Sequence, residues 1–486
     1  MKRNQFLTRM RTVAYALLGL GVLTLASCAQ DGFDDETFQS SVRNAVLESP
    51  DAGDITVTPS ADGKSQTISW PVVEGAGGYL VSFFDTGNLD QPIVADSIVD
   101  GCTITVKREE DVNYRFQVLT LGNKAMGNSD AAAPTLLDYN TFAEAFAAIP
   151  TGTDLYEYFQ ANPIPDSEEA LYYDLEPGGS YTLSQPLDFS NHNIVLRTTS
   201  KTDYATITYG ETGSMEYCGG FSLKYLNIDC SASSKPTFAF SATPAEGMLD
   251  AANNNHNQIT EPTAIMNCNI TGVKGMLLYD NKVKYCLKTF LLDNCTVHLE
   301  SENMTNGSII YIYDGGGFIN DLTFTNSTIW NTGANHNYLI RYNNSGRCDR
   351  AGYATNSINF LNCTMYNIAK SGQMCNHGGF DGRATSNYDI EDCIFVDCGN
   401  NQVPRRIVGR RGAGAEIVFN HNTYWFDGAP ETEGAPESVE TGTSTYDDSH
   451  NALQGDPALA DPDNGNFTPS GAEQLQYKTG DPRWLP

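Results

Sequence analysis

The strongest constraint on how this chain folds is a short phrase that recurs about every thirty residues through its C-terminal two-thirds. Each copy joins alternating apolar residues to an Asn or Asp, a Cys or a similar small residue, a Thr or Asn, and a second apolar pair. Six copies begin at Ile265, Leu292, Phe324, Phe360, Ile390 and Phe419, and a looser copy begins at Leu223. The copies show strand-like alternation and no 3.6-residue helical period, so the sequence predicts a solenoid of β-strands.

Stacking of coils explains the composition of the phrase. One coil cannot bury its apolar side alone, so each coil must be covered by the next. An Asn at a tight bend, such as Asn267 or Asn294, can then hydrogen-bond to its equivalent one coil away. Cysteines beside these bends, such as Cys268 and Cys295, suit a cramped interior as small apolar residues. We therefore expect most of the twelve cysteines to be core residues, and the Asn-Cys-Thr triplets to be structural ladders and not glycosylation acceptors.

The two ends of the repeat region resemble those of pectin-lyase-like β-helices. The start contains the run Tyr173–Leu183 with its Pro-Gly-Gly turn, followed by short strands at 187–189 and 193–196. The end, residues 455–484, is similar to that of β-helix families found in Bacteroidetes polysaccharide-utilisation clusters. The resemblance implies an all-β protein in which residues 169–486 form a right-handed parallel β-helix of the pectin-lyase-like type.

Residues 51–135 carry a second, non-repeating pattern of short strands and turns. Trp70 ends the second strand, Tyr79 opens the third, and a Tyr-x-Phe-x-Val strand begins at Tyr114. These markers resemble a fibronectin type III module, which implies an N-terminal β-sandwich with Trp70 and Tyr79 in its core. Residues 136–168 are expected to be a helical connector and cap, with short helices near 140–146 and 155–159.

The N-terminus has the pattern of a targeting segment. A positively charged start and an apolar run too short to span a membrane predict a signal peptide over residues 1–27. The run ends in Leu-Ala-Ser-Cys, which resembles the lipobox of bacterial lipoproteins and implies acylation of Cys28. In the acidic tether, residues 28–50, the segment 31–36 resembles the surface-export signal of Bacteroidetes lipoproteins. Together these resemblances imply lipid anchoring in the outer membrane with exposure at the cell surface.

The charge of the chain limits its partners. A formal net charge of −30 argues against nucleic acid as a partner. Within this acidic chain, arginines are concentrated between residues 341 and 411, and guanidinium groups bind carboxylates and sulfates with paired hydrogen bonds. The candidate glycan-binding residues are Arg341, Tyr342, Arg350, Arg383, Arg405, Arg410 and Tyr313. Six tyrosines are candidate stacking platforms for sugar rings: Tyr279, Tyr311, Tyr313, Tyr338, Tyr342 and Tyr353. The alternative for the arginines is a set of solvent-facing side chains paired with nearby carboxylates.

Three activities are usual on the scaffold that this chain resembles: glycoside hydrolysis, elimination of uronates and glycan binding without turnover. The paired-Asp, Gly-His-Gly and Arg-Ile-Lys motifs of the polygalacturonase family do not occur in the β-helix in a matching form, which argues against hydrolysis. A calcium-dependent lyase acting on uronates would use Arg341 or Arg383 as the base, with Asp280 and Asp314 as candidate calcium ligands. Strand termination explains those two aspartates equally well.

The sequence favours binding without turnover. The favoured function is a cell-surface polysaccharide-binding lipoprotein of a glycan-utilisation system, which binds acidic plant or host polymer along the β-helix face for neighbouring uptake proteins. A polysaccharide lyase on the same scaffold and an adhesin or structural envelope protein remain as alternatives.

Overall fold

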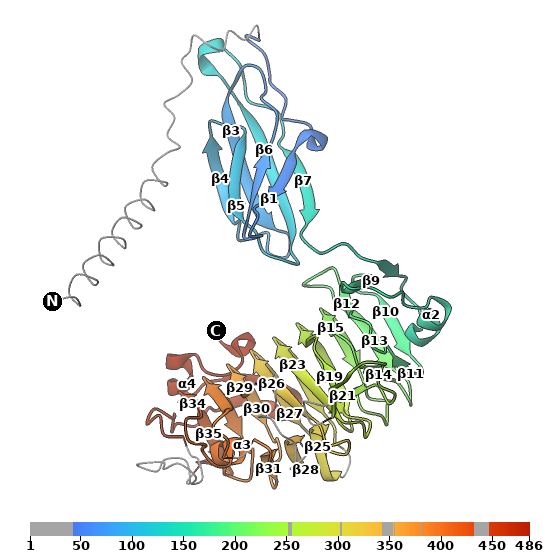
Figure 1. Cartoon of the computed structure of the whole chain (residues 1–486). Coiled ribbons are helices and arrows are strands. Elements are labelled where there is room, and N and C mark those ends of the chain that lie inside the picture. The colour runs from blue at the N-terminus through green and yellow to red at the C-terminus, as the bar shows by residue number, and fades with distance from the viewer. Residues whose placement is uncertain are drawn as a thin grey trace, which may run out of the picture. The chain divides into compact units, whose positions relative to one another are not determined.

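The computed structural model describes residues 42–250, 255–301, 304–342, 353, 355–380, 382–431 and 447–486. The chain forms two compact units that divide between Thr141 and Phe142 (Figure 1). The expected signal peptide, the expected acylation site Cys28 and most of the expected tether lie outside the described residues. No helix within the described ranges is long and apolar enough to cross a membrane.

The first unit is a β-sandwich of two antiparallel sheets. One sheet has the order β1 (Thr56–Pro59), β2 (Ser65–Ser69), β5 (Thr103–Lys107), and the other β4 (Val94–Val99), β3 (Ala76–Asp85), β6 (Asn113–Gly122), β7 (Thr135–Asn140). Trp70 lies between the sheets, with its ring centroid 5.4 Å from those of Tyr79 and Phe116. Trp70 and Tyr79 are therefore core residues, as expected. The predicted boundary at residue 135 is one strand too early, because β7 completes the second sheet.

The expected helical connector is only partly helical. Helix α2 (Leu155–Ala161) begins where predicted, with Asp154 accepting a hydrogen bond from the Glu157 backbone N–H at 3.2 Å. The prediction of a helix near residues 140–146 is wrong. The chain leaves β7 at Asn140 and next enters a strand, β8 (Ala147–Ile149), which pairs in parallel with the first coil. Long-range contacts override the local helical pattern here: the buried guanidinium of Arg197 donates to the Ala143 carbonyl and lies over the Phe142 ring.

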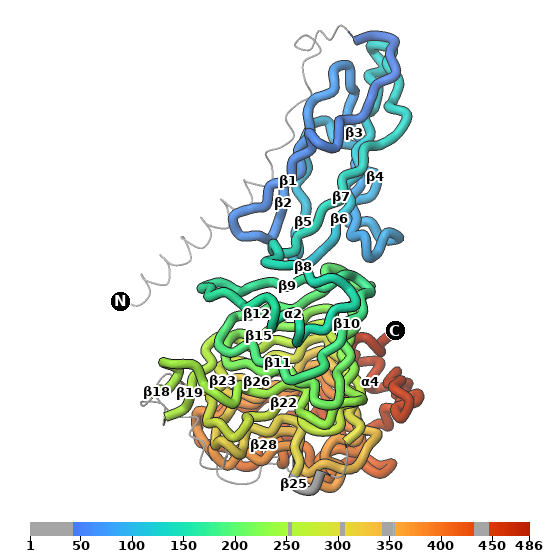
Figure 2. Tube along the Cα trace, turned by 90° about the vertical axis from the view of Figure 1, so that its right-hand side faces the viewer, coloured from blue at the N-terminus to red at the C-terminus, as the bar shows by residue number. Residues whose placement is uncertain are grey.

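The second unit is a right-handed parallel β-helix whose walls are three sheets (Figures 1 and 2). The twelve-stranded sheet contains, from its C-terminal end, β34 (Ile417–Asn420), β32 (Ser386–Glu391), β29 (Asn356–Leu361), β26 (Phe318–Thr325), β23 (Tyr285–Asp293), β20 (Thr263–Met266), β15 (Phe221–Lys224), β12 (Ile194–Thr198), β9 (Leu171–Leu175) and β8, with the hairpin β18 (Leu249–Asp250) and β19 (His256–Ile259) beside β23. The ten-stranded sheet contains β10 (Ser180–Leu183), β13 (Ala205–Tyr209), β16 (Leu226–Asp229), β21 (Asn269–Val273), β24 (Thr296–Leu299), β27 (Thr328–Asn331), β30 (Thr364–Tyr366), β33 (Ile394–Val396), β35 (Thr423–Phe426) and the short antiparallel β36 (Ala429–Pro430).

The third wall is the seven-stranded sheet. It contains β11 (Pro186–Asp188), β14 (Ser214–Tyr217), β17 (Phe238–Phe240), β22 (Leu278–Tyr279), β25 (Met304–Ile312), β28 (His336–Tyr342) and β31 (Gln373–Asn376). In the last coil, α3 (Val403–Val408) lies between β33 and β34 and packs against β31. The last coil is followed by the hairpin β37 (Leu459–Asp461) and β38 (Asn466–Pro469), α4 (Ala472–Tyr477) and the 3-10 turn η4 (Pro482–Trp484).

The strand register confirms the repeat read from the sequence. The first apolar residue of each copy is paired with the first residue of the next copy, in the order Leu223, Ile265, Leu292, Phe324, Phe360, Ile390, Phe419. All of these side chains are buried in one continuous core. The repeat therefore sets the lateral alignment of the coils, because a one-residue slip would turn each of these side chains out to solvent.

The expected Asn ladder is present at the bends that follow β20, β23, β26 and β29 in the twelve-stranded sheet. Asn267, Asn294, Asn326 and Asn362 all have left-handed backbone conformations, with φ between 49° and 54°, which Asn tolerates better than most residues. Asn294 donates to the side-chain oxygen of Asn267 at 2.6 Å, and Asn326 donates to Asp293 at 3.0 Å.

The cysteines beside these bends are buried and free, as expected, and they also form hydrogen bonds. The backbone N–H of Cys268 donates to the Cys295 sulfur at 3.4 Å, and that of Cys363 donates to the Cys393 sulfur at 3.4 Å. The Ser327 hydroxyl accepts the same bond from the Cys295 N–H at 3.0 Å. This position therefore requires a small side chain that can accept a hydrogen bond from the preceding coil, which explains why Ser replaces Cys in one copy.

We predict that Asn326→Ala lowers the free energy of unfolding by about 2 kcal/mol, since Ala loses the ladder bond and is strained in a left-handed conformation. Asn326→Gly should cost about 1 kcal/mol, because Gly adopts that conformation without strain. Asn359→Ala is the matched control: it removes a comparable inter-coil bond, to Thr323 at 3.0 Å, from an ordinary strand position. Equal losses for both Ala variants in urea titrations would contradict the role of the left-handed bend.

We also predict that the native protein resists alkylation at its described cysteines in the β-helix. Burial raises the thiol pKa of Cys230 and Cys286 to about 12 and that of Cys295 and Cys393 well above its usual value, so little thiolate forms. Iodoacetamide at mildly alkaline pH should label these positions only after denaturation, as read by peptide mass spectrometry. Rapid labelling of Cys295 or Cys393 in the folded protein would contradict this packing.

Candidate functional site

The outer face of the seven-stranded sheet presents one row of residues at a single register position. Strand pairing aligns them in the order Asp188, Glu216, Ala239, Tyr279, Tyr311, Arg341, Asn376. The preceding residues in the strands, such as Leu278, Ile310 and Ile340, are buried in the core. Because side chains alternate along a strand, the row faces outward.

Four tyrosines and one arginine meet at the centre of this row, and we call them the Tyr–Arg cluster: Tyr279, Tyr311, Tyr313, Tyr338 and Arg341. The Tyr279 and Tyr311 rings are 5.9 Å apart and 20° from parallel, and the Tyr311 and Tyr313 rings are 6.0 Å apart and 9° from parallel. The Arg341 guanidinium carbon lies 3.9 Å from the centroid of the Tyr313 ring and 5.2 Å from that of Tyr338. These distances are within the range of cation–π attraction.

Asp314 positions two of the rings. Its carboxylate accepts the Tyr279 hydroxyl at 3.0 Å and the Tyr311 hydroxyl at 2.9 Å. Burial, and after it the hydrogen bond to Asp314, raises the pKa of Tyr311 to about 12, so the hydroxyl stays protonated and continues to donate. The two rings are thereby fixed side by side with half-buried faces.

The two predicted calcium ligands have other partners in this structure. Asp280 is buried, and its two carboxylate oxygens accept the backbone N–H groups of Lys282 at 2.9 Å and Gly315 at 2.8 Å. Burial raises the pKa of Asp280 to about 6. Both oxygens of Asp314 are occupied by tyrosine hydroxyls. The described ranges contain no group of three or more His, Cys, Asp or Glu side chains arranged to hold a metal ion. Calcium ligation by Asp280 and Asp314 stays a prediction.

The structure separates the other predicted residues. The prediction that Tyr342 lies at the surface is wrong. The alternation that turns Arg341 outward turns Tyr342 into the core, where its ring centroid lies 5.4 Å from that of Phe380. Tyr353 is likewise buried, with the Lys288 ammonium 4.5 Å from its ring centroid. Arg350 lies outside the described residues.

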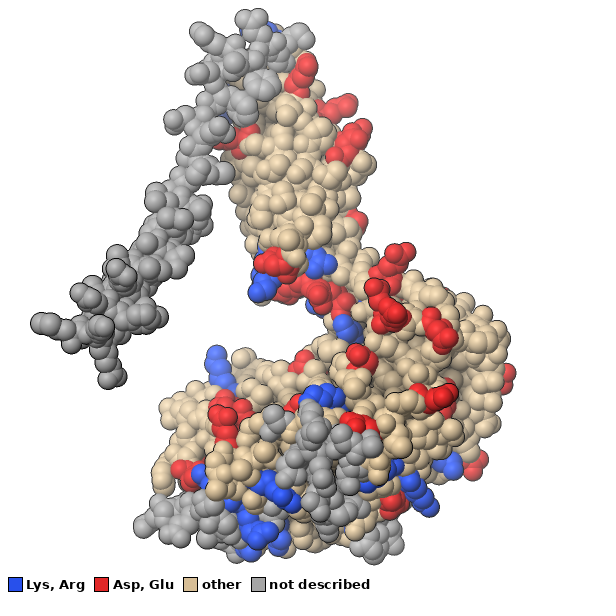
Figure 3. Space-filling view, in the orientation of Figure 1, with Lys and Arg blue, Asp and Glu red and all other residues tan. Residues whose placement is uncertain are grey.

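The remaining arginines form a second basic region beyond the last strand of the seven-stranded sheet. Arg405 is on α3, which packs against β31. Arg410 follows that helix, and its carbonyl accepts the Gly382 N–H at 3.0 Å, which places it beside Arg383. Figure 3 shows basic side chains gathered over this end of the β-helix. Arg341 is thus set among tyrosines, whereas Arg405 lies on α3 and Arg410 lies beside Arg383 after that helix.

Comparisons with known proteins place the chain among domains without an assigned activity. Three family models match consecutive segments, DUF4992 over residues 1–178, DUF4957 over 179–332 and DUF5123 over 358–484, and each is described as a domain of unknown function. No protein with a curated description matches the sequence.

Several solved structures are similar to parts of the chain. A pectate lyase from Erwinia chrysanthemi in complex with tetragalacturonic acid is 12% identical over 64% of this chain and 84% of its own, with a TM-score of 0.17. A pectate lyase from Pectobacterium carotovorum is 11% identical over 66% and 89%, with a TM-score of 0.19. A family 28 exopolygalacturonase from Yersinia enterocolitica is 12% identical over 81% and 94%, with a TM-score of 0.19. TM-scores this low support no inference about a site, and the β-helix is established by the strand pairing itself.

Proposed function

We propose that this protein binds an acidic polysaccharide at the bacterial cell surface as a lipid-anchored component of a glycan-utilisation system. The observation that supports this proposal is the Tyr–Arg cluster on the outer face of the seven-stranded sheet. It combines aromatic faces, a guanidinium group and a carboxylate that orients the rings.

The chemistry of the cluster suits a carboxylated sugar polymer. A tyrosine ring offers an apolar face, against which the C–H groups of a sugar ring can pack. A guanidinium stacked on a ring binds a carboxylate through its in-plane N–H groups. Neighbouring strands of a sheet are about 4.8 Å apart. A polymer lying along the row would therefore meet Tyr279, Tyr311 and Arg341 in succession.

Local electrostatics allow an acidic ligand on an acidic protein. The formal net charge of −30 is spread over the whole chain, and screening at physiological ionic strength confines each exposed charge to about 8 Å. Beside the cluster, the Asp314 carboxylate is engaged by two hydroxyl donors. Arg383, Arg405 and Arg410 extend the basic surface beyond β31.

The same proposal includes display at the cell surface, which is supported only by the N-terminal sequence pattern. Acylation of Cys28 would anchor the chain, and the acidic tether and the β-sandwich would serve as spacers between the membrane and the β-helix. Neighbouring uptake proteins would then receive polymer that the β-helix holds.

The proposal predicts that the protein lacking residues 1–27 is retarded in gels containing polygalacturonate, alginate or hyaluronate, but not neutral galactan. Tyr311→Ala and Arg341→Ala should each weaken binding roughly tenfold or more, since aromatic and Arg anchors dominate binding energy. Arg341→Lys should be intermediate, because Lys keeps the charge and loses the planar fork. Arg115→Ala, in the exposed ion pair of Arg115 with Asp138 on the sandwich, is the matched control and should bind normally.

The same gels distinguish the alternatives. Shortening of a uronate polymer with an ultraviolet-absorbing product, abolished by a calcium chelator, would replace the binding proposal by a lyase. Retardation that Tyr311→Ala and Arg341→Ala leave unchanged would place the glycan elsewhere. No retardation by any acidic polymer would favour an adhesin.

A further inference from the structure

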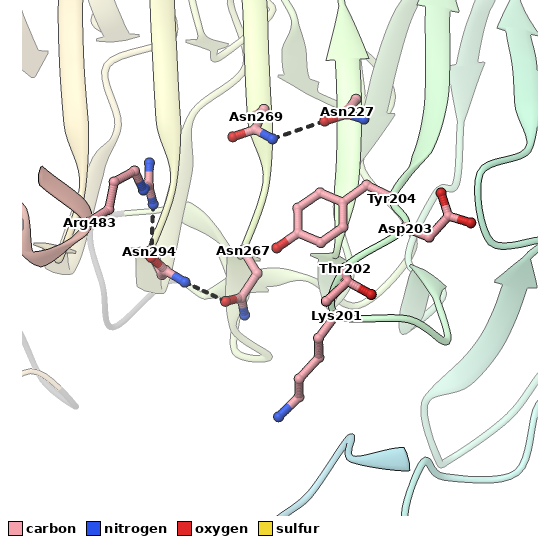
Figure 4. Close-up of a pocket in the computed structure, with 9 residues that line it drawn as sticks. All are labelled: Lys201, Thr202, Asp203, Tyr204, Asn227, Asn267, Asn269, Asn294 and Arg483. Carbon is pink, nitrogen blue, oxygen red and sulfur yellow. Dashed lines mark hydrogen bonds between the residues drawn. The ribbon is translucent and has the colours of Figure 1, made fainter. Parts of the chain in front are cut away.

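A second polar site lies on a different wall of the β-helix, where two features depart from the repeat. In later coils a single left-handed residue, such as Asn267 or Asn294, leads from the twelve-stranded to the ten-stranded sheet. Between β12 and β13 this bend is replaced by a loop, residues 199–204. The longer loop brings Lys201 and Tyr204 beside the Asn ladder (Figure 4).

The second departure is the C-terminal tail, which runs back over the ten-stranded sheet toward the N-terminal coils. The Gly480 N–H donates to the Asp392 carbonyl at 2.7 Å, and the Asp481 N–H donates to the Thr364 hydroxyl at 3.0 Å. One coil further on, the Trp484 indole N–H donates to the Thr328 hydroxyl at 2.8 Å. Arg483 then reaches the next coil, where its guanidinium donates to the Asn294 side-chain oxygen at 2.8 Å.

The loop and the tail leave a pocket of about 440 Å³ between them. Its size is within the roughly 300–1,000 Å³ of small-molecule sites. Figure 4 shows Arg483 on one side, the Tyr204 ring with Lys201 on the other, and the Asn side chains between them. The Tyr204 ring, half-buried, gives the pocket one aromatic wall.

The lining side chains offer mostly hydrogen-bond donors. Asn269 donates to Asn227 at 2.9 Å and Asn294 donates to Asn267 at 2.6 Å, so these amides are held in place by the ladder. Within the described ranges, the Asn267 amide nitrogen, the Tyr204 hydroxyl and the Lys201 ammonium form no hydrogen bond or ion pair. Burial raises the pKa of Tyr204, so its hydroxyl remains a donor.

The charge balance of the pocket is opposite to that of the chain. Lys201 and Arg483 contribute two positive charges, and Asp203 is the acidic residue of the lining. In Figure 4 the Asp203 carboxylate points away from the Tyr204 hydroxyl. Asp481, which lies 3.5 Å from the Arg483 guanidinium, is buried and accepts the Thr328 hydroxyl at 2.7 Å. In a chain with a net charge of −30, a pocket with this balance favours an anionic ligand.

We infer that this pocket binds a single uronate sugar residue, separately from the Tyr–Arg cluster on the seven-stranded sheet. Arg483 receives the carboxylate, and Lys201, on the opposite side of the pocket, adds a second positive charge. The ladder amides bind sugar hydroxyls, and the Tyr204 ring packs against the sugar face. The site takes one residue or a chain end, because the tail covers the sheet on the Arg483 side. This inference goes beyond the proposed function and does not depend on it.

The test is saturation-transfer NMR and calorimetry with the monosaccharide galacturonate, using galactose and galactose 6-sulfate as comparison probes. Galacturonate should bind the protein, and galactose should bind at least roughly tenfold more weakly. Lys201→Ala and Arg483→Gln should each weaken galacturonate binding about tenfold. Arg483→Gln keeps a side-chain donor for Asn294, so loss of binding with an unchanged melting temperature reports the charge and not a loosened tail.

A matched control separates this site from unspecific effects of substitution. Lys64→Ala, in the β-sandwich, should leave galacturonate binding unchanged. Galacturonate binding that survives both Lys201→Ala and Arg483→Gln would overturn the inference. Absence of galacturonate binding to the unaltered protein would also overturn the inference, and so would a preference for galactose or galactose 6-sulfate. Retardation by polymer in gels remains the separate test of the proposed function.

Discussion

Hydrogen bonding between neighbouring coils is the interaction on which the rest of this structure depends. Each coil leaves its backbone groups and its apolar side incomplete until the next coil covers both, so the coils are stable only as a stack. The tight bend is where this requirement is most demanding. There an Asn in a left-handed conformation bonds across coils, and the neighbouring Cys or Ser accepts a backbone N–H from the preceding coil. These two bonds hold successive coils in a single register.

This register places the equivalent residues of successive coils next to one another on the surface of the β-helix. Once the bends are aligned, residues at equivalent places in successive coils form straight rows, and alternation along each strand decides which rows face solvent. Tyr279, Tyr311 and Arg341 come from three separate coils and become neighbours for this reason. The same rule places Tyr342 in the core, one residue from Arg341. A scaffold of this kind suits extended ligands, since its rows are as long as the stack.

The pocket arises where the repeat is broken. A perfect solenoid would present only shallow rows, because every bend would be alike. The loop at residues 199–204 precedes β13 and the returning tail reaches the bend before β24, so the strands β16 and β21 lie between them. The space above these two strands is enclosed on two sides. The Tyr–Arg cluster and the pocket therefore have different origins: the first follows from regular stacking, and the second from two local exceptions to it.

The sequence by itself determined the features that repeat. The spacing of Ile265, Leu292, Phe324 and their equivalents predicted the solenoid, the alignment of its coils, the Asn bends and the buried cysteines, because each depends on local pattern and on contact with an identical neighbour. Tertiary structure alone decided the features that depend on distant, non-repeating contacts. Arg483 meets Asn294 across 189 residues of chain. Residues near 143 are held by Arg197 in a non-helical segment although their composition suits a helix. Local preferences amount to a few tenths of a kcal/mol per residue, so a buried hydrogen-bonded arginine outweighs them, and no pattern within a short window reveals it.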